Sequence, residues 1–223
     1  MRPVVIKNNR SLSVQIGLSP NADGEITYRI YSQSDESSVH SAGTALTISI
    51  DKAEAVDIES VKKRCGNFKT GLEFYGDKTE KQFTSSLISV REIFFNETEA
   101  LALLQLSSDI NESSYDFGRY LTFMNSALAT GVFGLHPEVL SGKTVTELLE
   151  TNAPDIPFSL GGFAVLQSAM PNTCYAHAVS HEFGEYRTFD IELLDLSGNI
   201  LVRFENLAVR PAFMTASENM GSQ

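Results

Sequence analysis

Apolar and polar residues alternate along several stretches of the chain, with the period of two that is typical of half-buried β-strands. Residues 11–31 predict a hairpin, because two alternating stretches flank the turn-forming run Pro20–Gly24. A polar stretch, Ser32–Ser38, follows, and a further strand is expected over Leu46–Ile50. The clearest hairpin spans residues 189–204, where Ser-Gly-Asn turns the chain between two alternating runs.

Helical spacing of apolar residues is rarer. Residues 57–65 predict a short helix that ends at Gly66, where a C-terminal glycine belongs. A longer helix is predicted over about Ser114–Thr130, with Phe117, Leu121, Met124 and Leu128 among the residues of its buried stripe. A weaker helix is predicted at Val145–Glu150. Many antiparallel strands and one strongly apolar helix favour an α+β fold in which a curved sheet wraps a helix.

The net charge of the chain disfavours some classes of binding partner. Seventeen basic against 28 acidic residues give a formal net charge of −11 over 223 residues, which disfavours binding to nucleic acid or to an anionic membrane surface. No apolar run reaches the roughly 20 residues of a membrane-spanning helix, and the N-terminus lacks the apolar stretch of a secretory signal. Cys65 and Cys174 are therefore expected to be reduced and buried, and the protein to be cytoplasmic.

Residue chemistry alone indicates no self-sufficient catalytic site. His177 and His181 lie four apart, but Thr173–Ser180 predicts a strand, where that spacing separates side chains by roughly 13 Å. No metal site is expected, because no cluster of further ligands completes one. The sequence has no phosphate-binding loop, no nucleophile elbow and no dinucleotide fingerprint. The pair Gly161-Gly162 indicates a bend or a bulge.

Several ordered segments resemble the dehydratase domain of modular polyketide synthases, especially those of trans-acyltransferase assembly lines. The resemblance covers about residues 2–213. The segments that carry it are Tyr31-Ser32 with Val39–Gly43, the helix Asp57–Cys65 that ends in Arg-Cys, Leu72–Asp77 with Gln82-Phe83, Pro157–Leu160, and the closing hairpin Phe189–Arg210. Relative to the family, this chain lacks a tryptophan before Val39–Gly43, and Asp77 replaces a proline.

The resemblance implies a double-hotdog fold, in which antiparallel sheets wrap a central helix and the active site lies between two lobes. It predicts a partial first lobe over residues 1–55, an inter-lobe helix and linker over 56–71, a second lobe over 72–213 and a flexible tail over 214–223. The first lobe is expected to be incomplete, as an N-terminally truncated and degenerate version of the family, with no central helix within residues 1–50.

The family's chemistry depends on a histidine base in the first lobe and an aspartic acid on the helix of the second lobe. The histidine motif should precede the strand that begins near Arg2, and none of the four histidines of this chain matches it. For the acid, Tyr120–Leu128 resembles the family's helix and places Asn125 at the aspartate position. An alternative alignment through His136–Leu140 places Ser141 there. Asparagine can orient a ligand by hydrogen bonds but has no proton to give at neutral pH.

The resemblance also implies that Tyr75, Gly76, Tyr120 and Ala129 contact substrate, Ala129 standing where the family has a glutamine. The substrate would be a 3-hydroxyacyl or enoyl thioester tethered to the phosphopantetheine of an acyl carrier protein, with no other cofactor. Expected partners are the carrier protein, other polyketide synthase domains and a second copy of the chain. No dehydration by this chain alone is expected.

Two alternatives stay open at this point. One is a repurposed double-hotdog enoyl isomerase, pyran-forming or chain-branching domain, which needs a histidine supplied upstream of Met1. The other is a hotdog-like binding module without catalysis.

Overall fold

The computed structural model describes residues 4, 11–33, 35–47, 54–77, 89–106, 116–151, 155–167, 169–183 and 186–211. The chain divides into two compact units, Met1–Asp51 and Lys52–Gln223. The predicted tail 214–223 and the segment Gln82-Phe83 lie outside the described residues.

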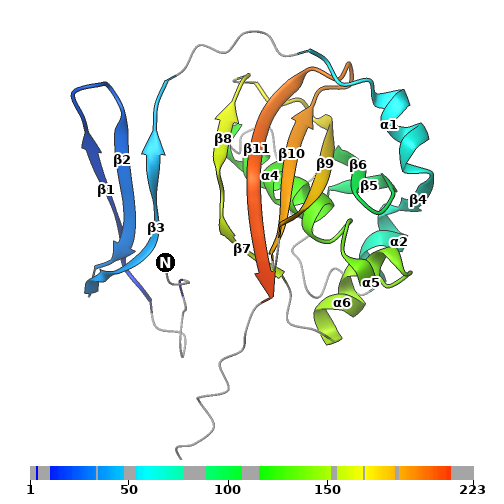
Figure 1. Cartoon of the computed structure of the whole chain (residues 1–223), viewed down its shortest axis with the longest axis horizontal. Coiled ribbons are helices and arrows are strands. Elements are labelled where there is room, and N and C mark those ends of the chain that lie inside the picture. Colours follow the sequence, from blue (N-terminus) through cyan, green and yellow to red (C-terminus); the bar gives the residue numbers. More distant parts are fainter. Residues whose placement is uncertain are drawn as a thin grey trace, which may run out of the picture. The chain divides into compact units, whose positions relative to one another are not determined.

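The described part of the first unit is a three-stranded antiparallel sheet in the order β1-β2-β3, formed by β1 (Val14–Pro20), β2 (Ile26–Ser32) and β3 (Asp35–Ala45) (Figure 1). The turn between β1 and β2 is built by Asn21, whose Oδ1 accepts hydrogen bonds from the backbone N–H groups of Asp23 and Glu25. Gly24 takes the positive φ of 82° that this turn requires. The predicted hairpin is thus confirmed, and the described residues up to Thr47 form no helix.

The third strand differs from its prediction. A strand was expected over Leu46–Ile50, but β3 ends at Ala45, Leu46 and Thr47 are outside any strand, and residues 48–50 are not described. Most of the stretch Ser32–Ser38, expected to be merely polar, instead belongs to β2 and β3. Cross-strand hydrogen bonding to β2 explains the difference, since a strand paired along its length needs no apolar alternation of its own.

The second unit is built on one antiparallel sheet in the order β4-β5-β6-β9-β10-β11-β7, with β8 also paired to β11. Its strands are β4 (Asn67–Thr70), β5 (Val90–Phe95), β6 (Glu99–Gln105), β7 (Asp155–Ser159), β8 (Gly162–Val165), β9 (Thr173–Phe183), β10 (Tyr186–Leu194) and β11 (Ile200–Pro211). Its helices are α1 (Ile58–Cys65), α2 (Gly71–Tyr75), α4 (Asp116–Val132), α5 (Pro137–Leu140) and α6 (Val145–Thr151).

Most predicted boundaries in this unit hold. Asp57 caps α1 by accepting a hydrogen bond from the N–H of Ser60, and Gly66 ends the helix with a φ of 72°. The closing hairpin is β10 and β11. The glycine pair marks the break between β7 and β8, which both pair with β11, and Gly161 donates to the carbonyl of Glu205 at 3.0 Å.

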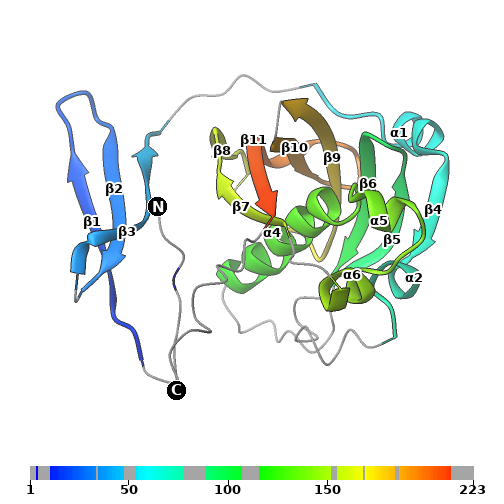
Figure 2. The same ribbon diagram turned by 60° about the horizontal axis from the view of Figure 1, so that its bottom comes forward.

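Helices cover both faces of the sheet. Ala100, Ala102 and Leu104 of β6 belong to the main core with α4, whereas Leu101 packs with Val61 and Cys65 of α1. This follows from the strand period of two, which sends Leu101 to the face opposite its neighbours. Figure 2 shows α4 lying along the concave side of the sheet, where it contacts β6, β9 and β10.

The helix predicted over Ser114–Thr130 is α4, but its orientation differs from the prediction. Leu121, expected to be buried, has 48% of its surface exposed, whereas Phe123 and Ala127 are fully buried. Met124 and Leu128 are partly buried against the core, and the side chain of Phe117 is not described.

Small residues explain this orientation of α4. A methyl group on Gly131 would lie only 2.8 Å from Ile191 Cδ1 and 3.5 Å from Ala178 Cβ. The helix therefore approaches the sheet through Gly131 and Ala127, and the larger Leu121 is left on the other side.

Candidate functional site

The candidate site begins on the exposed side of α4. Asn125 is exposed, and Leu121, one turn earlier on the same face, is exposed as well. The next residue, Ser126, is fully buried. Asn125 can therefore hydrogen-bond to a ligand from outside the core, while its neighbour anchors the helix inside.

Tyr75 ends α2 and lies close to α4 at Ser126, the residue that follows Asn125. It is 5% exposed, and burial raises the pKa of its hydroxyl to about 12, while the nearby Ser126 and the backbone of Val90 act in the opposite direction. Ser89 Oγ donates to Ser126 Oγ at 2.6 Å, so that Ser89, Ser126 and Tyr75 form a buried hydroxyl cluster. The Tyr75 hydroxyl consequently stays protonated near neutral pH, next to the residue that follows Asn125.

Gly76 has a backbone conformation that only glycine adopts readily. Its φ is 94°, and a Cβ at this position would lie 2.9 Å from Thr144 Oγ1. Thr144 caps α6 through reciprocal hydrogen bonds with Glu147. The end of α2 is therefore pressed against the start of α6.

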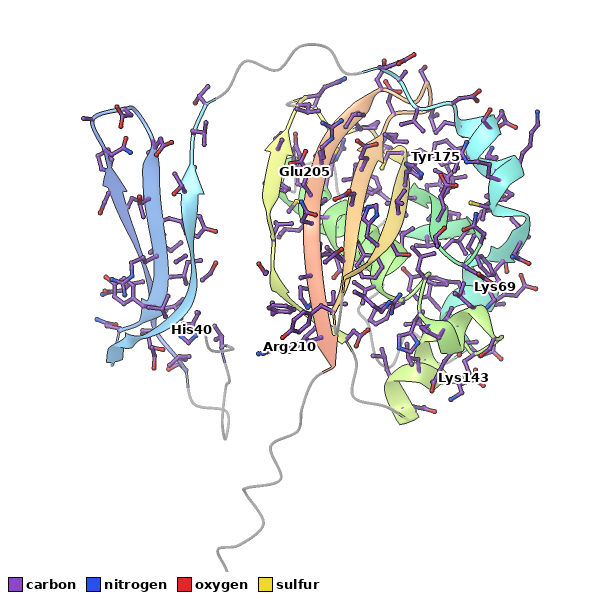
Figure 3. All side chains as sticks on the ribbon, viewed as in Figure 1. His40, Lys69, Lys143, Tyr175, Glu205 and Arg210 are labelled. Carbon is purple, nitrogen blue, oxygen red and sulfur yellow. The ribbon has the colours of Figure 1, made fainter. Side chains whose placement is uncertain are left out.

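Lys69 on β4 forms hydrogen bonds with the segment that contains α5 and leads into α6. Its Nζ donates to the carbonyls of Val139 at 2.9 Å and Lys143 at 3.3 Å, and burial lowers its pKa. Figure 3 shows Lys69 and Lys143 at the end of the unit where α2, α5 and α6 lie. These contacts fix α5 and α6 on β4, so Lys69 supports the segment that carries Tyr75 and Gly76.

The other two predicted substrate contacts are placed differently. Tyr120 is half-buried, and its hydroxyl donates to the carbonyl of Gln167 at 2.9 Å, which ties α4 to the segment after β8. Ala129 is 8% exposed and lies on the packed part of α4. The structure thus joins Tyr75 to α4 at Ser126, but gives Tyr120 a partner of its own and leaves Ala129 little open surface.

The alternative acid position lies outside α4. His136 caps the short helix α5, its Nδ1 accepting from the N–H of Glu138 at 3.3 Å, and burial lowers its pKa. Ser141 follows α5, is exposed, and donates to the carbonyl of Glu138 at 2.9 Å. Ser141 is therefore part of a turn, whereas Asn125 is part of the long core helix.

The remaining histidines also have protein partners. His177 Nε2 lies 2.9 Å from Glu99 Oε1, and His181 Nε2 lies 3.0 Å from Asp190 Oδ2. Both residues lie on β9, which extends the predicted strand Thr173–Ser180 as far as Phe183, and each has its own carboxylate. Among the described residues, no group of three or more potential metal ligands gathers.

His40 lies on β3 of the first unit, where its Nε2 is 2.8 Å from the hydroxyl of the buried Ser32 (Figure 3). Both residues belong to the segments that carry the family resemblance. Their contact joins the end of β2 to the middle of β3.

Both cysteines are buried, as expected. Cys65 and Cys174 are 1% and 0% exposed, and burial raises their thiol pKa values to about 11 and about 12. Neither thiol is ionised at neutral pH, so neither is an activated nucleophile.

Sequence reasoning missed two polar clusters. One is the hydroxyl cluster of Ser89, Ser126 and Tyr75. The other joins Arg64 to Glu99 at 2.6 Å and Glu99 to His177, under α1. Hydrogen bonds from Arg64 lower the pKa of Glu99. The sequence signal closest to this cluster was the Arg-Cys pair at the end of α1. Glu99 and His177 are distant from it in sequence, so local patterns could not join them.

Comparisons with known proteins agree with the sequence resemblance. No family model matches the chain. Polyketide synthase PksN of Bacillus subtilis is 26% identical over an alignment of 222 positions, which covers 95% of this chain and 4% of PksN. The chain therefore spans a small fraction of the curated relatives it matches.

The fold of this chain is similar to that of several solved structures. The dehydratase domain of a trans-acyltransferase polyketide synthase from Brevibacillus brevis has a TM-score of 0.72 and 23% identity, over 93% of this chain and 72% of that chain. A pyran synthase domain from module nine of the sorangicin pathway has a TM-score of 0.67 and 21% identity, over 92% and 73%. The chain has the α+β double-hotdog fold of polyketide synthase dehydratase domains, and it is similar to them in sequence.

The part of the chain that the structure describes contains no helix long and apolar enough to cross a membrane.

Proposed function

We propose that this chain is a dehydratase-like domain of a polyketide synthase, which accommodates a carrier-bound 3-hydroxyacyl or enoyl thioester without dehydrating it. The observation that carries the proposal is Asn125. It is an exposed amide on the core helix of a dehydratase-like fold, at the position where the resemblance expects the catalytic acid.

Elimination of water from a 3-hydroxyacyl thioester needs two proton transfers. A base removes the proton next to the thioester carbonyl, and an acid protonates the departing hydroxyl. Asn125 can donate a hydrogen bond to that hydroxyl or to the carbonyl, but it cannot protonate either. The nearby Tyr75 hydroxyl, with its pKa of about 12, is a poor acid at neutral pH and is buried.

The histidines of the chain do not supply the missing base in this proposal. None of them matches the family's histidine motif, which should precede the strand that begins near Arg2. Asn125 would then orient a bound thioester, with the α2 end that carries Tyr75 and Gly76 supporting α4 nearby.

The binding partners that we propose for this chain are inferred from its polyketide synthase relatives. PksN is named a polyketide synthase, and this chain corresponds to 4% of its length. We therefore expect other polyketide synthase domains and an acyl carrier protein as partners, with substrate attached through phosphopantetheine and no other cofactor.

A second candidate is a pyran-forming domain, favoured by the likeness to the sorangicin pyran synthase domain. Ring closure adds a hydroxyl to an enoyl thioester within one molecule, so it needs orientation and a base more than a strong acid. This candidate needs a histidine from outside the printed sequence.

The test uses the purified chain and a 3-hydroxyacyl thioester of pantetheine or of a carrier protein, with mass spectrometry to detect loss of water. The Brevibacillus dehydratase domain serves as the positive control for the assay. We expect binding without water loss. Turnover that survives both Asn125→Ala and Ser141→Ala would show that the site lies elsewhere, and turnover abolished by His136→Ala would favour the Ser141 alignment. Cyclisation of a hydroxy-enoyl thioester would select the pyran-forming candidate.

A further inference from the structure

One face of the three-stranded sheet carries a shallow depression of about 220 Å³, lined by Gly17, Ser19, Thr27, Arg29 and Tyr31. The strand register explains this grouping. Gly17 pairs with Arg29, and Ser19 pairs with Thr27. Residues that pair directly in an antiparallel sheet present their side chains on the same face. The depression is therefore a property of β1 and β2 themselves.

Small residues open the space around Arg29. Gly17 lies opposite it on β1 and Ala42 lies opposite it on β3. The ring of Tyr31 leans over Gly17, since a Cβ on Gly17 would lie 3.5 Å from Tyr31 Cε1 and 4.0 Å from its hydroxyl. Gly17 thus forms the floor of the depression and Tyr31 forms one wall.

The chemistry of this face is cationic and hydroxylated. Arg29 is exposed, and no carboxylate of the described residues forms an ion pair with it. Ser19, Thr27 and Thr44 occupy neighbouring positions in one row across the three strands. Each of them supplies a hydroxyl donor. Arg29 therefore shares this face of the sheet with several hydroxyl donors, and the depression lies among them.

The negative charge of the protein is concentrated elsewhere. Residues 1–51 contain four basic and five acidic residues, against 13 basic and 23 acidic residues in 52–223. The charge of −11 that disfavours anions for the whole chain thus belongs almost entirely to the second unit. The first unit is close to neutral, so an anion near Arg29 meets little general repulsion.

We infer that this depression binds the phosphate group of a phosphate ester. A guanidinium fork matches two phosphate oxygens, and the Ser19, Thr27 and Tyr31 hydroxyls can donate to the remaining oxygens. A volume of about 220 Å³ exceeds a lone phosphate and leaves room for the first atoms of the esterified chain against the Tyr31 ring. The inference concerns the first unit alone and does not depend on the proposed function.

The test is a titration of the ¹⁵N-labelled full chain, followed by NMR at the backbone amides of Gly17, Thr27 and Arg29. The probes are 4′-phosphopantetheine, inorganic phosphate and pantetheine. We expect saturable shifts with both phosphate-containing probes and none with pantetheine. Binding should weaken as salt is raised, because the site is exposed.

Two variants separate the charge from the shape of the depression. Arg29→Gln should weaken 4′-phosphopantetheine binding about tenfold or more, since it removes the charge-assisted hydrogen bonds. Gly17→Val should fill the floor and weaken binding while the strand is kept, because a Cβ there meets only ordinary contacts. Arg91→Gln is the matched control, an exposed arginine on β5 of the other unit, and should leave binding unchanged.

Each outcome decides the inference. Equal binding of pantetheine and 4′-phosphopantetheine would overturn it, and so would an equal loss of binding in Arg29→Gln and Arg91→Gln. An absence of saturable shifts with both phosphate-containing probes would overturn it as well. Tighter binding of 4′-phosphopantetheine than of inorganic phosphate supports an ester as the ligand. Equal binding of the two assigns the site to free phosphate and overturns the ester.

Discussion

The tip of the β10–β11 hairpin is the place where a single methyl group should cost the most. Gly198 has a φ of 85°, and a Cβ there would lie 2.0 Å from the carbonyl oxygen of Val56. The carbonyl of Gly198 accepts a hydrogen bond from the N–H of Val56 at 2.9 Å. The hairpin tip is therefore docked, backbone to backbone, on the segment that leads into α1.

Gly198→Ala perturbs this contact in three ways. The left-handed backbone costs about 1–2 kcal/mol for a residue with a side chain. Moving the tip away from Val56 loses a hydrogen bond worth about 1 kcal/mol and disturbs close packing by about 1–3 kcal/mol. We expect a total loss of about 3–6 kcal/mol in the free energy of unfolding, or a fall in Tm of roughly 6–24 °C for a unit of this size.

The assay is urea and thermal unfolding followed by circular dichroism, with two matched glycine variants. Gly66→Ala shares the positive φ, at 72°, but has no atom within 4 Å of the added Cβ. It should lose only about 1–2 kcal/mol. Gly118→Ala, in α4 and without either problem, should gain up to about 1 kcal/mol. The reasoning is refuted if Gly198→Ala costs no more than Gly66→Ala.

Three further predictions concern the site and its surroundings. Asn125→Asp alone should not produce water loss from a 3-hydroxyacyl thioester in the mass-spectrometric assay, because it restores an acid without a base; measurable dehydration would contradict this. The pKa of Glu99 is lowered by Arg64 in the folded state, so its contribution to stability is fully present above the ordinary value of about 4.5 and is lost as the pH falls through the lowered value. Urea midpoints measured from pH 7 to pH 3 should fall less steeply in Glu99→Gln than in the unmodified chain, and identical slopes would argue against this role. Ser126→Ala removes the acceptor of the buried Ser89 hydroxyl and should cost about 1–3 kcal/mol. Ser89→Ala with Ser126→Ala should cost less than the sum of the two single changes in urea unfolding, and strict additivity would show that the two hydroxyls do not interact.

Local signals in the sequence were sufficient for many elements. Asp57 and Gly66 bracket α1 because a carboxylate satisfies free N–H groups at a helix start and glycine tolerates the left-handed end. The alternation in residues 189–204 predicts β10 and β11 because one side of each strand faces the core. The resemblance to polyketide synthase dehydratases likewise came from ordered motifs, and the fold comparison agrees with it.

Contacts between distant segments decided the rest. The apolar residues of α4 predicted a helix, but its orientation depends on the close approach of Gly131 to Ala178 and Ile191, which periodicity does not encode. The assignment of Asn125 to the position of the acid stays a prediction, whereas its exposure is a property of that orientation.

The sequence by itself determined the α+β class, the long helix, the hairpins and the family resemblance, since these depend on residues close together in the chain. Only the tertiary structure showed that the third strand runs from Asp35 to Ala45, that Tyr75 lies against Ser126, and that Arg29 stands in an open depression. The physical reason is the same in each case. Hydrogen bonds and van der Waals contacts act over a few ångströms in space, whatever the separation in sequence.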